Sequence, residues 1–267
     1  MKSFFPLFLL LFFASCAGNL YRPSVAYAPQ FKEKNELEIG ASAGLGSGGQ
    51  VQAGWAATNH FGLQVQANAA GKNTANILGG PGWRKVYPLK NEVYFVSTFS
   101  AGYSGGMNQR EKSRVTGTAA TAGVEAQPGY IVYKMDARWH GAFAQYSFGI
   151  WGQDAACLYG GIRMQWLNCS SFHYSSRFYA TQSDKPGFFM PALTRKADPS
   201  NGFTMLVEDF VGVRIGKKQL KFLFQVQWRY QYTGENLNDH WGKVSVGEGV
   251  IGFEYRFNKA KPAVNSN

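Results

Sequence analysis

The pair Asp239-His240, followed by Trp241, has side-chain types that could activate a water molecule for hydrolysis. Such a site would need a second carboxylate at matching height, and only Asp136 and Asp184 could be proposed. An adjacent Asp and His in a polar segment is far more often ordinary loop chemistry. The sequence also contains no HExxH motif and no phosphate-binding loop motif. We therefore expect no enzymatic activity. The alternative is a hydrolase whose site lies in this segment, at the outer rim of a barrel.

The cysteines and histidines predict neither a disulfide nor a metal site. Cys157 and Cys169 would lie on one strand roughly 40 Å apart at about 3.3 Å per residue, which is too far for a disulfide. The sequence has no CxxC motif and no Cys/His cluster, and His60 and His173 are isolated. We expect no metal and no cofactor, and two buried small apolar cysteines.

Charged residues recur on the polar side of the expected strands, where they would face the interior of a small barrel. Side chains fill such an interior, and buried charges must pair there. If the barrel closes, Glu38 and Glu254 become neighbours on the first and last strands, with Arg229 and Arg256 facing them. We predict structural ion pairs, and the alternative is a narrow polar path for a small solute. The residues predicted to form these pairs are Glu36, Glu38, Arg163, Arg229, Glu254 and Arg256, with Arg214, Lys221 and possible Glu248 also on this side.

The strands that position these residues show a two-residue alternation. In 220–232, LKFLFQVQWRYQY, the even positions are apolar and most odd positions are polar, so the two faces of a strand differ in polarity. Ten segments are expected to be strands: 35–44, 50–57, 61–70, 74–87, 92–103, 140–151, 157–169, 203–215, 220–232 and 244–257. The short turns then fall on one side and the long connections, expected to be irregular over 104–139 and 170–202, on the other. This sorting is typical of outer-membrane barrels.

Two of these strands are imperfect. Residues 79–82, Gly-Gly-Pro-Gly, interrupt 74–87, and proline in a strand belongs at an edge or a bulge. Asp209 falls on the apolar face of 203–215, so either a bulge switches the faces there or a neighbour buries the carboxylate.

The N-terminus predicts export. Lys2 precedes an apolar run over 4–13 and the small residues Ala14-Ser15, a layout typical of a signal peptide. The run is too short for a spanning helix, which needs roughly 20 residues. The following Cys16 is similar to the lipidated cysteine of a bacterial lipobox, although Phe13 departs from the usual aliphatic residue. The alternative is an ordinary signal peptide cut nearby.

The formal charge of +11 predicts contact with anionic surfaces. For an exported chain, lipid headgroups and lipopolysaccharide phosphates are simpler partners than nucleic acid, which we do not expect. The sequence does not indicate an oligomeric state.

The pattern resembles the small outer-membrane β-barrel lipoproteins of Bacteroidota-type bacteria. The resemblance rests on ASC (14–16), NELEIGASAG (35–44), GWAATNHFGLQVQA (54–67), GVRIGKKQLKFLFQVQW (212–228) and IGFEYRF (251–257). The ending on Phe257 is similar to the signal that the outer-membrane insertion machinery reads, although ten residues follow it. The resemblance implies a place and a fold more than an activity.

Together these observations predict an all-β chain forming a closed antiparallel up-and-down transmembrane barrel of about ten strands, with eight to twelve possible. The expected organisation is a signal peptide (1–15), a lipidated tether (16–34), the barrel (35–257) and a disordered tail (258–267). We expect a structural or interaction role in the bacterial outer membrane, anchored at Cys16. The alternatives are a narrow pore or solute-binding barrel, a rim hydrolase, and a soluble lipid-tethered periplasmic barrel whose apolar faces point inward.

Overall fold

A computed structural model describes residues 24–44, 47–70, 73–119, 127–152, 155–180, 193–195, 203–216, 219–233 and 247–257 of the 267-residue chain. Within these ranges, no helix is long and apolar enough to cross a membrane. The strands are β1 (Leu37–Gly44), β2 (Gly48–Trp55), β3 (Phe61–Ala69), β4 (Thr74–Pro88), β5 (Val93–Ala119), β6 (Gln127–Gly152), β7 (Ala156–Ala180), β8 (Leu193–Arg195), β9 (Phe203–Ile215), β10 (Leu220–Thr233) and β11 (Glu248–Phe257).

The strands close into an antiparallel barrel. Hydrogen bonding follows the order β6-β5-β4-β3-β2-β1-β11-β10-β9-β7, and a further pairing of β6 with β7 joins the two ends. Ten strands therefore form the ring in up-and-down order, while the short β8 pairs with β7 outside it. The predicted ten-stranded closed barrel is confirmed. Closure leaves no unpaired edge in the wall.

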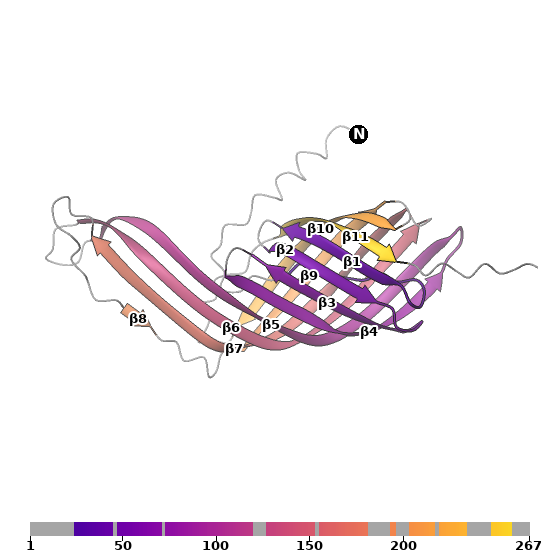
Figure 1. Ribbon diagram of the computed structural model, residues 1–267, viewed down its shortest axis with the longest axis horizontal. Helices are drawn as coiled ribbons and strands as arrows, with labels where there is room; N and C mark the ends of the chain where they lie inside the picture. Colours follow the sequence, from indigo (N-terminus) through magenta and orange to yellow (C-terminus); the bar gives the residue numbers. More distant parts are fainter. Residues whose placement is uncertain are drawn as a thin grey trace, which may run out of the picture.

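The two ends of the barrel differ in their connections. We call the end with the β2–β3, β4–β5, β6–β7 and β9–β10 connections the short-turn end, where β1 also begins and β11 ends. We call the opposite end the long-strand end, because β5, β6 and β7 continue past it. Figure 1 shows these three strands leaving the barrel as one curved extension, with β8 beside it.

The extension corrects the expectation that 104–139 and the first part of 170–202 are irregular. The β5–β6 ladder runs from Val93 and Gly152 to Ala119 and Gln127, with one irregularity near its end. The β6–β7 ladder likewise continues to Gly129 and Ala180. Much of this sequence lacks the apolar alternation used to find the other strands. Backbone pairing extends the sheet beyond the part of the wall that carries the alternation.

The two imperfect strands have different explanations. β9 pairs with β10 and β7 without a register shift, so no bulge occurs at Asp209. The Asp209 side chain stays on the outer face, half-buried, with Trp228 and Ile162 as its cross-strand partners. In β4, the ladder to β5 has no partners at Gly80 and Pro81. A Cβ at Gly80 would lie within 2.7 Å of the Gly102 Cα, so glycine allows the close backbone approach there.

The wall is apolar outside and polar inside. Each ring strand exposes a large apolar side chain by 42–60%: Ile39, Val51, Val65, Ile77, Phe99, Ile150, Leu158, Val211, Phe222 and Ile251. Each also buries a polar side chain facing inward: Glu38, Gln52, Gln66, Arg84, Ser100, Gln145, Arg163, Glu208, Gln225 and Glu254. The alternative of a soluble barrel with its apolar faces inward is therefore wrong, because alternation sets the two faces oppositely.

The lumen contains part of the chain's own N-terminal region. Residues 24–31, which we call the lumen segment, are buried. Val25, Ala26 and Ala28 of this segment pack in one cluster with inward-facing wall residues, including Trp151 and Phe210. The segment predicted as a tether thus crosses the barrel interior before the chain turns into β1.

Candidate functional site

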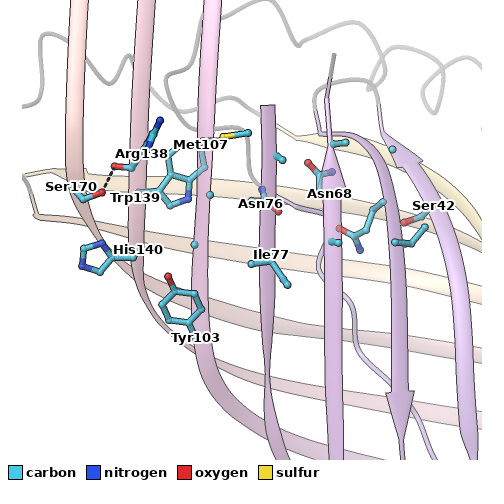
Figure 2. Close-up of a pocket in the computed structure, with 18 of the residues that line it drawn as sticks. Ser42, Asn68, Asn76, Ile77, Tyr103, Met107, Arg138, Trp139, His140 and Ser170 are labelled. Atoms are coloured by element: carbon cyan, nitrogen blue, oxygen red, sulfur yellow. Dashed lines mark hydrogen bonds between the residues drawn. The ribbon is translucent and has the colours of Figure 1, made fainter. Parts of the chain in front are cut away.

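The outer face has a hollow of about 1260 Å³ on the side where the extension leaves the barrel. Figure 2 shows the residues around it, which come from β1 to β7. Its large apolar members, Val51, Ile77, Tyr103 and Met107, are among the exposed side chains of the wall. The hollow is therefore a concave part of the apolar outer surface.

The lumen holds the second candidate site, which is organised around the backbone of the lumen segment. Arg163 Nη2 donates to the Ser24 carbonyl at 2.7 Å, and Gln145 Nε2 donates to the Tyr27 carbonyl at 2.7 Å. The Ala26 amide donates to Gln227 Oε1 at 3.0 Å. These inward side chains satisfy backbone groups that are buried away from water, as buried polar groups require.

Two further arginines hold the second half of the lumen segment. Arg214 Nη2 donates to the Ala28 carbonyl at 2.8 Å, and Arg256 Nη2 donates to the Gln30 carbonyl at 3.2 Å. Both guanidinium groups also pair with carboxylates of the wall, so each arginine joins the segment to the barrel. The segment is thus held in an extended path by its main chain.

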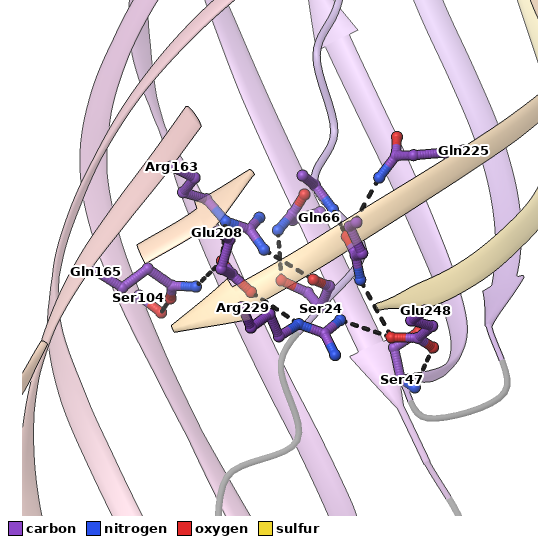
Figure 3. A network of polar contacts seen from close by, with 12 residues as sticks. Ser24, Ser47, Gln66, Ser104, Arg163, Gln165, Glu208, Gln225, Arg229 and Glu248 are labelled. Carbon is purple, nitrogen blue, oxygen red and sulfur yellow. Dashed lines mark hydrogen bonds and ion pairs between the residues drawn. The ribbon is translucent and has the colours of Figure 1, made fainter. Parts of the chain in front are cut away.

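A branched ionic network lies near the long-strand end (Figure 3). Glu208 accepts from Arg163 Nε at 2.6 Å and from Arg229 Nε at 3.2 Å. Arg229 Nη2 also donates to Glu248 Oε2 at 2.7 Å, and Glu248 Oε1 accepts from the Ser47 amide at 2.6 Å. The register explains the centre of the network, because Glu208 is directly opposite Arg163 on one side and Arg229 on the other.

A second ionic group lies toward the short-turn end. Arg214 Nε donates to Glu254 Oε2 at 2.5 Å, and its guanidinium lies 4.0 Å from the Tyr159 ring centre. Arg256 Nη2 donates to Glu38 Oε2 at 2.8 Å, across the β1–β11 pairing. The Tyr27 hydroxyl donates to Glu38 Oε1 at 3.0 Å, so the lumen segment joins this group too.

The two groups balance their charges. Arg163, Arg214, Arg229 and Arg256 are matched by four carboxylates: Glu38, Glu208, Glu248 and Glu254. All eight are nine-tenths or more buried. Balanced pairing is the condition under which such charges can remain ionised inside a wall of low dielectric.

The structure places all six residues of the predicted ionic set in the lumen, although their pairing differs in part from the expectation. Arg256 pairs with Glu38, and Glu36 lies 3.9 Å from Arg256 Nη1. Arg229 does not face Glu38 or Glu254 as expected, since it pairs with Glu208 and Glu248. Which strands become neighbours follows from closure, but which residues face each other depends on register and turn lengths.

Two features were missed by the sequence reasoning. Glu208 was overlooked although it alternates with Asp209 and therefore falls on the polar face. The lumen segment was missed because its contacts use backbone groups, which carry no sequence pattern. Cys16 and the pair Asp239-His240 lie outside the described residues.

The described residues offer no metal centre. Among them, no group of three or more His, Cys, Asp or Glu side chains is placed to hold a metal ion. Cys157 and Cys169 are both free, buried and on β7. The chemistry available in the described lumen is hydrogen bonding and ion pairing.

Comparison with known proteins adds little. No family model and no curated protein sequence matches the chain. Among solved structures, it is similar to Ail, the attachment invasion locus protein of Yersinia pestis, at 13% identity, covering 84% of this chain and 99% of that one, with a TM-score of 0.28. It is also similar to the CymD monoaromatic hydrocarbon channel at 10% identity, covering 94% and 99%, with a TM-score of 0.25. Scores this low carry no argument about the activity of this chain.

Proposed function

We propose that this chain is an outer-membrane β-barrel lipoprotein, anchored at Cys16, with a structural or interaction role and no enzymatic activity. The observation that carries the proposal is the polarity of the wall, apolar outside on every ring strand and polar inside. Soluble monomeric proteins rarely expose a continuous apolar surface of this extent, whereas a membrane barrel requires one.

The orientation follows from the connections. In single-chain outer-membrane barrels, the short turns face the periplasm and the longer connections face outward. The short-turn end is then periplasmic, and the extension formed by β5, β6 and β7 projects from the cell surface. A projecting sheet is suited to contact with other surface molecules, which supports an interaction role.

The filled lumen argues against transport as the main role. Arginines of both ionic groups hold the lumen segment, one near its start and two near its end. A passing solute would therefore have to displace paired charges. We therefore expect the intact protein to insert into planar bilayers without conductance. Steady single-channel currents from the intact protein would overturn the sealed-barrel part of the proposal.

The expected partners are lipids, lipopolysaccharide and the insertion machinery. The hollow of Figure 2 and the apolar band would contact acyl chains, and the basic chain would attract lipid phosphates. Phe257 ends β11 with its ring exposed on the outer face, beside Tyr255 at 4.6 Å between ring centres. This outward aromatic ending supports recognition by the insertion machinery.

A substitution at the middle of the apolar band tests the membrane location. Val65→Arg would place a charge on the outer face of β3, where an arginine at the bilayer midplane costs roughly 2–4 kcal/mol. Asn59→Arg, in the exposed β2–β3 connection, is the matched control and should cost little. The measurements are heat-modifiable gel migration and resistance to alkaline carbonate extraction. Release of the wild-type protein from membranes by alkaline carbonate would contradict the proposal.

A further inference from the structure

The hollow on the outer face combines small side chains with a cation at one edge. Its lining includes Ala67, Ala69 and Ala75 of β3 and β4, which we call the floor, and Arg138 and His140 of β6. We propose that the hollow binds one lipopolysaccharide molecule of the outer leaflet, with acyl chains over the floor and a phosphate group at Arg138. The proposal rests on the proposed outer-membrane location and orientation, and it names the lipid and the residues that bind it.

Strand register explains why the floor adjoins the cation. One row crosses the outer face through residues that are directly opposite one another on neighbouring strands: Ala69, Ala75, Met107 and Arg138. His140 likewise lies opposite Gly105 in β5. The row thus passes from small and apolar side chains to a guanidinium group. A molecule lying across it would meet an apolar surface at one end and hydrogen-bond donors at the other, which suits an amphiphile.

Arg138 lies at the outer limit of the wall. Thr74 begins β4 and pairs with Asn108 of β5, and beyond this pair β5 and β6 continue as the extension. Arg138 is opposite Met107, so it lies one residue inside that limit. In the proposed orientation this end faces outward. The phosphates of outer-leaflet lipids would then lie at the level of Arg138, with their acyl chains alongside the apolar wall.

A bulge in β7 shapes the hollow. Arg138 pairs with Ser171 and Trp139 pairs with Cys169, which leaves Ser170 as an extra residue between the two pairs. The Ser170 hydroxyl donates to the Arg138 carbonyl at 3.3 Å (Figure 2). Bulges of this kind bend a strand and increase its twist. The extension therefore turns away from the wall at the level of Arg138, and the outer face becomes concave there.

The charges around Arg138 favour an anion. The Arg138 side chain is exposed and forms no ion pair with any residue that the structure describes. Asp136, two residues away on the same face of β6, accepts from Gln109 Nε2 at 3.1 Å. Farther out, Glu111 pairs with Lys134 at 3.1 Å. The planar guanidinium of Arg138 presents several donors at once, which suits two oxygens of one phosphate group.

The size of the hollow favours a lipid with several acyl chains. Its volume of about 1260 Å³ exceeds the roughly 300–1,000 Å³ of clefts that hold drug-sized molecules. A phospholipid offers two chains beside its phosphate, whereas lipopolysaccharide offers more chains beside phosphates of the same charge. Tyr103 adds an aromatic side to the hollow, because a Cβ at Gly105 would lie 2.7 Å from its hydroxyl and the ring therefore lies over Gly105. An aromatic ring with a polar tip suits the boundary between acyl chains and headgroups.

Lipid retention by the purified full-length protein tests the proposal. The delipidated barrel in a nonionic detergent would be mixed with lipopolysaccharide, with dephosphorylated lipopolysaccharide or with phosphatidylglycerol, and bound lipid would be identified by native mass spectrometry. Arg138→Gln removes the cation, and Ala69→Trp fills the floor. Both residues are exposed, so neither change enters the lumen. The matched controls are Lys85→Gln, at an exposed lysine of β4 near the short-turn end, and Val211→Trp, on the exposed face of β9.

The wild type and both controls should retain one lipopolysaccharide molecule per barrel. Arg138→Gln should retain it about fivefold less, which is the factor expected for the loss of one cation beside a lipid phosphate. Ala69→Trp should retain little, because the indole would occupy the space of the acyl chains. Dephosphorylated lipopolysaccharide should bind the wild type and Arg138→Gln equally weakly.

Equal retention by Arg138→Gln and Lys85→Gln, or by Ala69→Trp and Val211→Trp, would overturn the proposal. A preference for phosphatidylglycerol would overturn the choice of lipid, and a lipid-free dimer that Arg138→Gln abolishes would assign the hollow to a second copy of the barrel. Heat-modifiable migration would first show that each variant is folded. A wild type that resists alkaline carbonate would leave the membrane barrel standing in all these cases, so the two proposals fail separately.

Discussion

Replacing Glu208 with glutamine should destabilise the barrel far more than its single lost charge would suggest on a protein surface. Glu208 is fully buried and accepts from Arg163 at 2.6 Å, Gln165 at 2.7 Å and Arg229 at 3.2 Å. Glutamine has nearly the same volume, so the substitution opens no cavity. Arg229 would keep Glu248, whereas Arg163 would lose its only carboxylate among the described contacts.

The magnitude follows from this stranded guanidinium. Breaking a buried ion pair by removing one partner costs about 3–5 kcal/mol, because the remaining charge stays buried without compensation. The double variant Arg163→Met with Glu208→Gln removes the stranded charge, so it should be less destabilised than Glu208→Gln alone. The exposed pair of Glu111 and Lys134, 3.1 Å apart, provides the matched control. Surface pairs contribute about 0–1 kcal/mol, so Glu111→Gln should change stability little.

The assay is equilibrium urea unfolding of the protein in lipid vesicles, followed by tryptophan fluorescence. The free energy of unfolding should fall for Glu208→Gln while the slope with urea stays unchanged. A loss for Glu208→Gln within about 1 kcal/mol of that for Glu111→Gln would refute the reasoning, because it would mean that water solvates the lumen charges. A double variant less stable than Glu208→Gln would also contradict the stranded-charge explanation.

Three further substitutions test other parts of the structure. Gly54→Leu should displace the lumen segment, because a Cβ there would lie 2.7 Å from both the Phe31 ring and the Tyr27 hydroxyl. Bilayer recordings of this variant should then show conductance. The control Gly152→Ala, with open space around its Cβ, should show none. Asp209→Asn should raise the free energy of unfolding by about 1 kcal/mol, since a carboxylate on the lipid face is unfavourable, and a loss of stability would mean that the carboxylate has a partner. Burial, with Arg256 nearby, lowers the pKa of Lys32 to about 8 despite the opposing effect of Glu36. Because the unfolded lysine titrates near pH 10.4, the unfolded chain binds more protons between about pH 8 and 10.4, and stability should rise with pH in that window. Lys32→Met should reduce the rise, and an identical pH profile would contradict the assignment.

The barrel could be predicted because its alternation is a property of single strands. The even positions of 220–232 include Phe222 and Phe224, and both are exposed on the outer face of β10. Strand number and orientation then follow from the turns between such segments. The extension of β5 to β7 could not be found in this way, because much of its sequence lacks the two-residue alternation of apolar and polar side chains.

The ionic lumen could be predicted in composition but not in full pairing. Alternation assigns Arg163, Arg229 and Glu254 to the inner face without reference to any other strand. Pairing depends on register, and a shift of a few residues along β9 would bring another side chain opposite Arg229. Arg256 and Glu38 are the simple case, because they are directly opposite on the two strands that closure brings together.

The lumen segment connects the alternation of the wall strands, which could be predicted, with the pairing of the lumen charges, which could be predicted only in part. Its main-chain carbonyls accept hydrogen bonds from arginines that already pair with carboxylates, so each of these guanidinium groups donates both to the wall and to the segment. Arginine suits this task because its planar group presents donors in several directions at once. The arginine-to-carboxylate balance of the lumen is therefore part of how the barrel holds its own N-terminal chain, and displacement of that chain should weaken the ionic groups as well as open the interior.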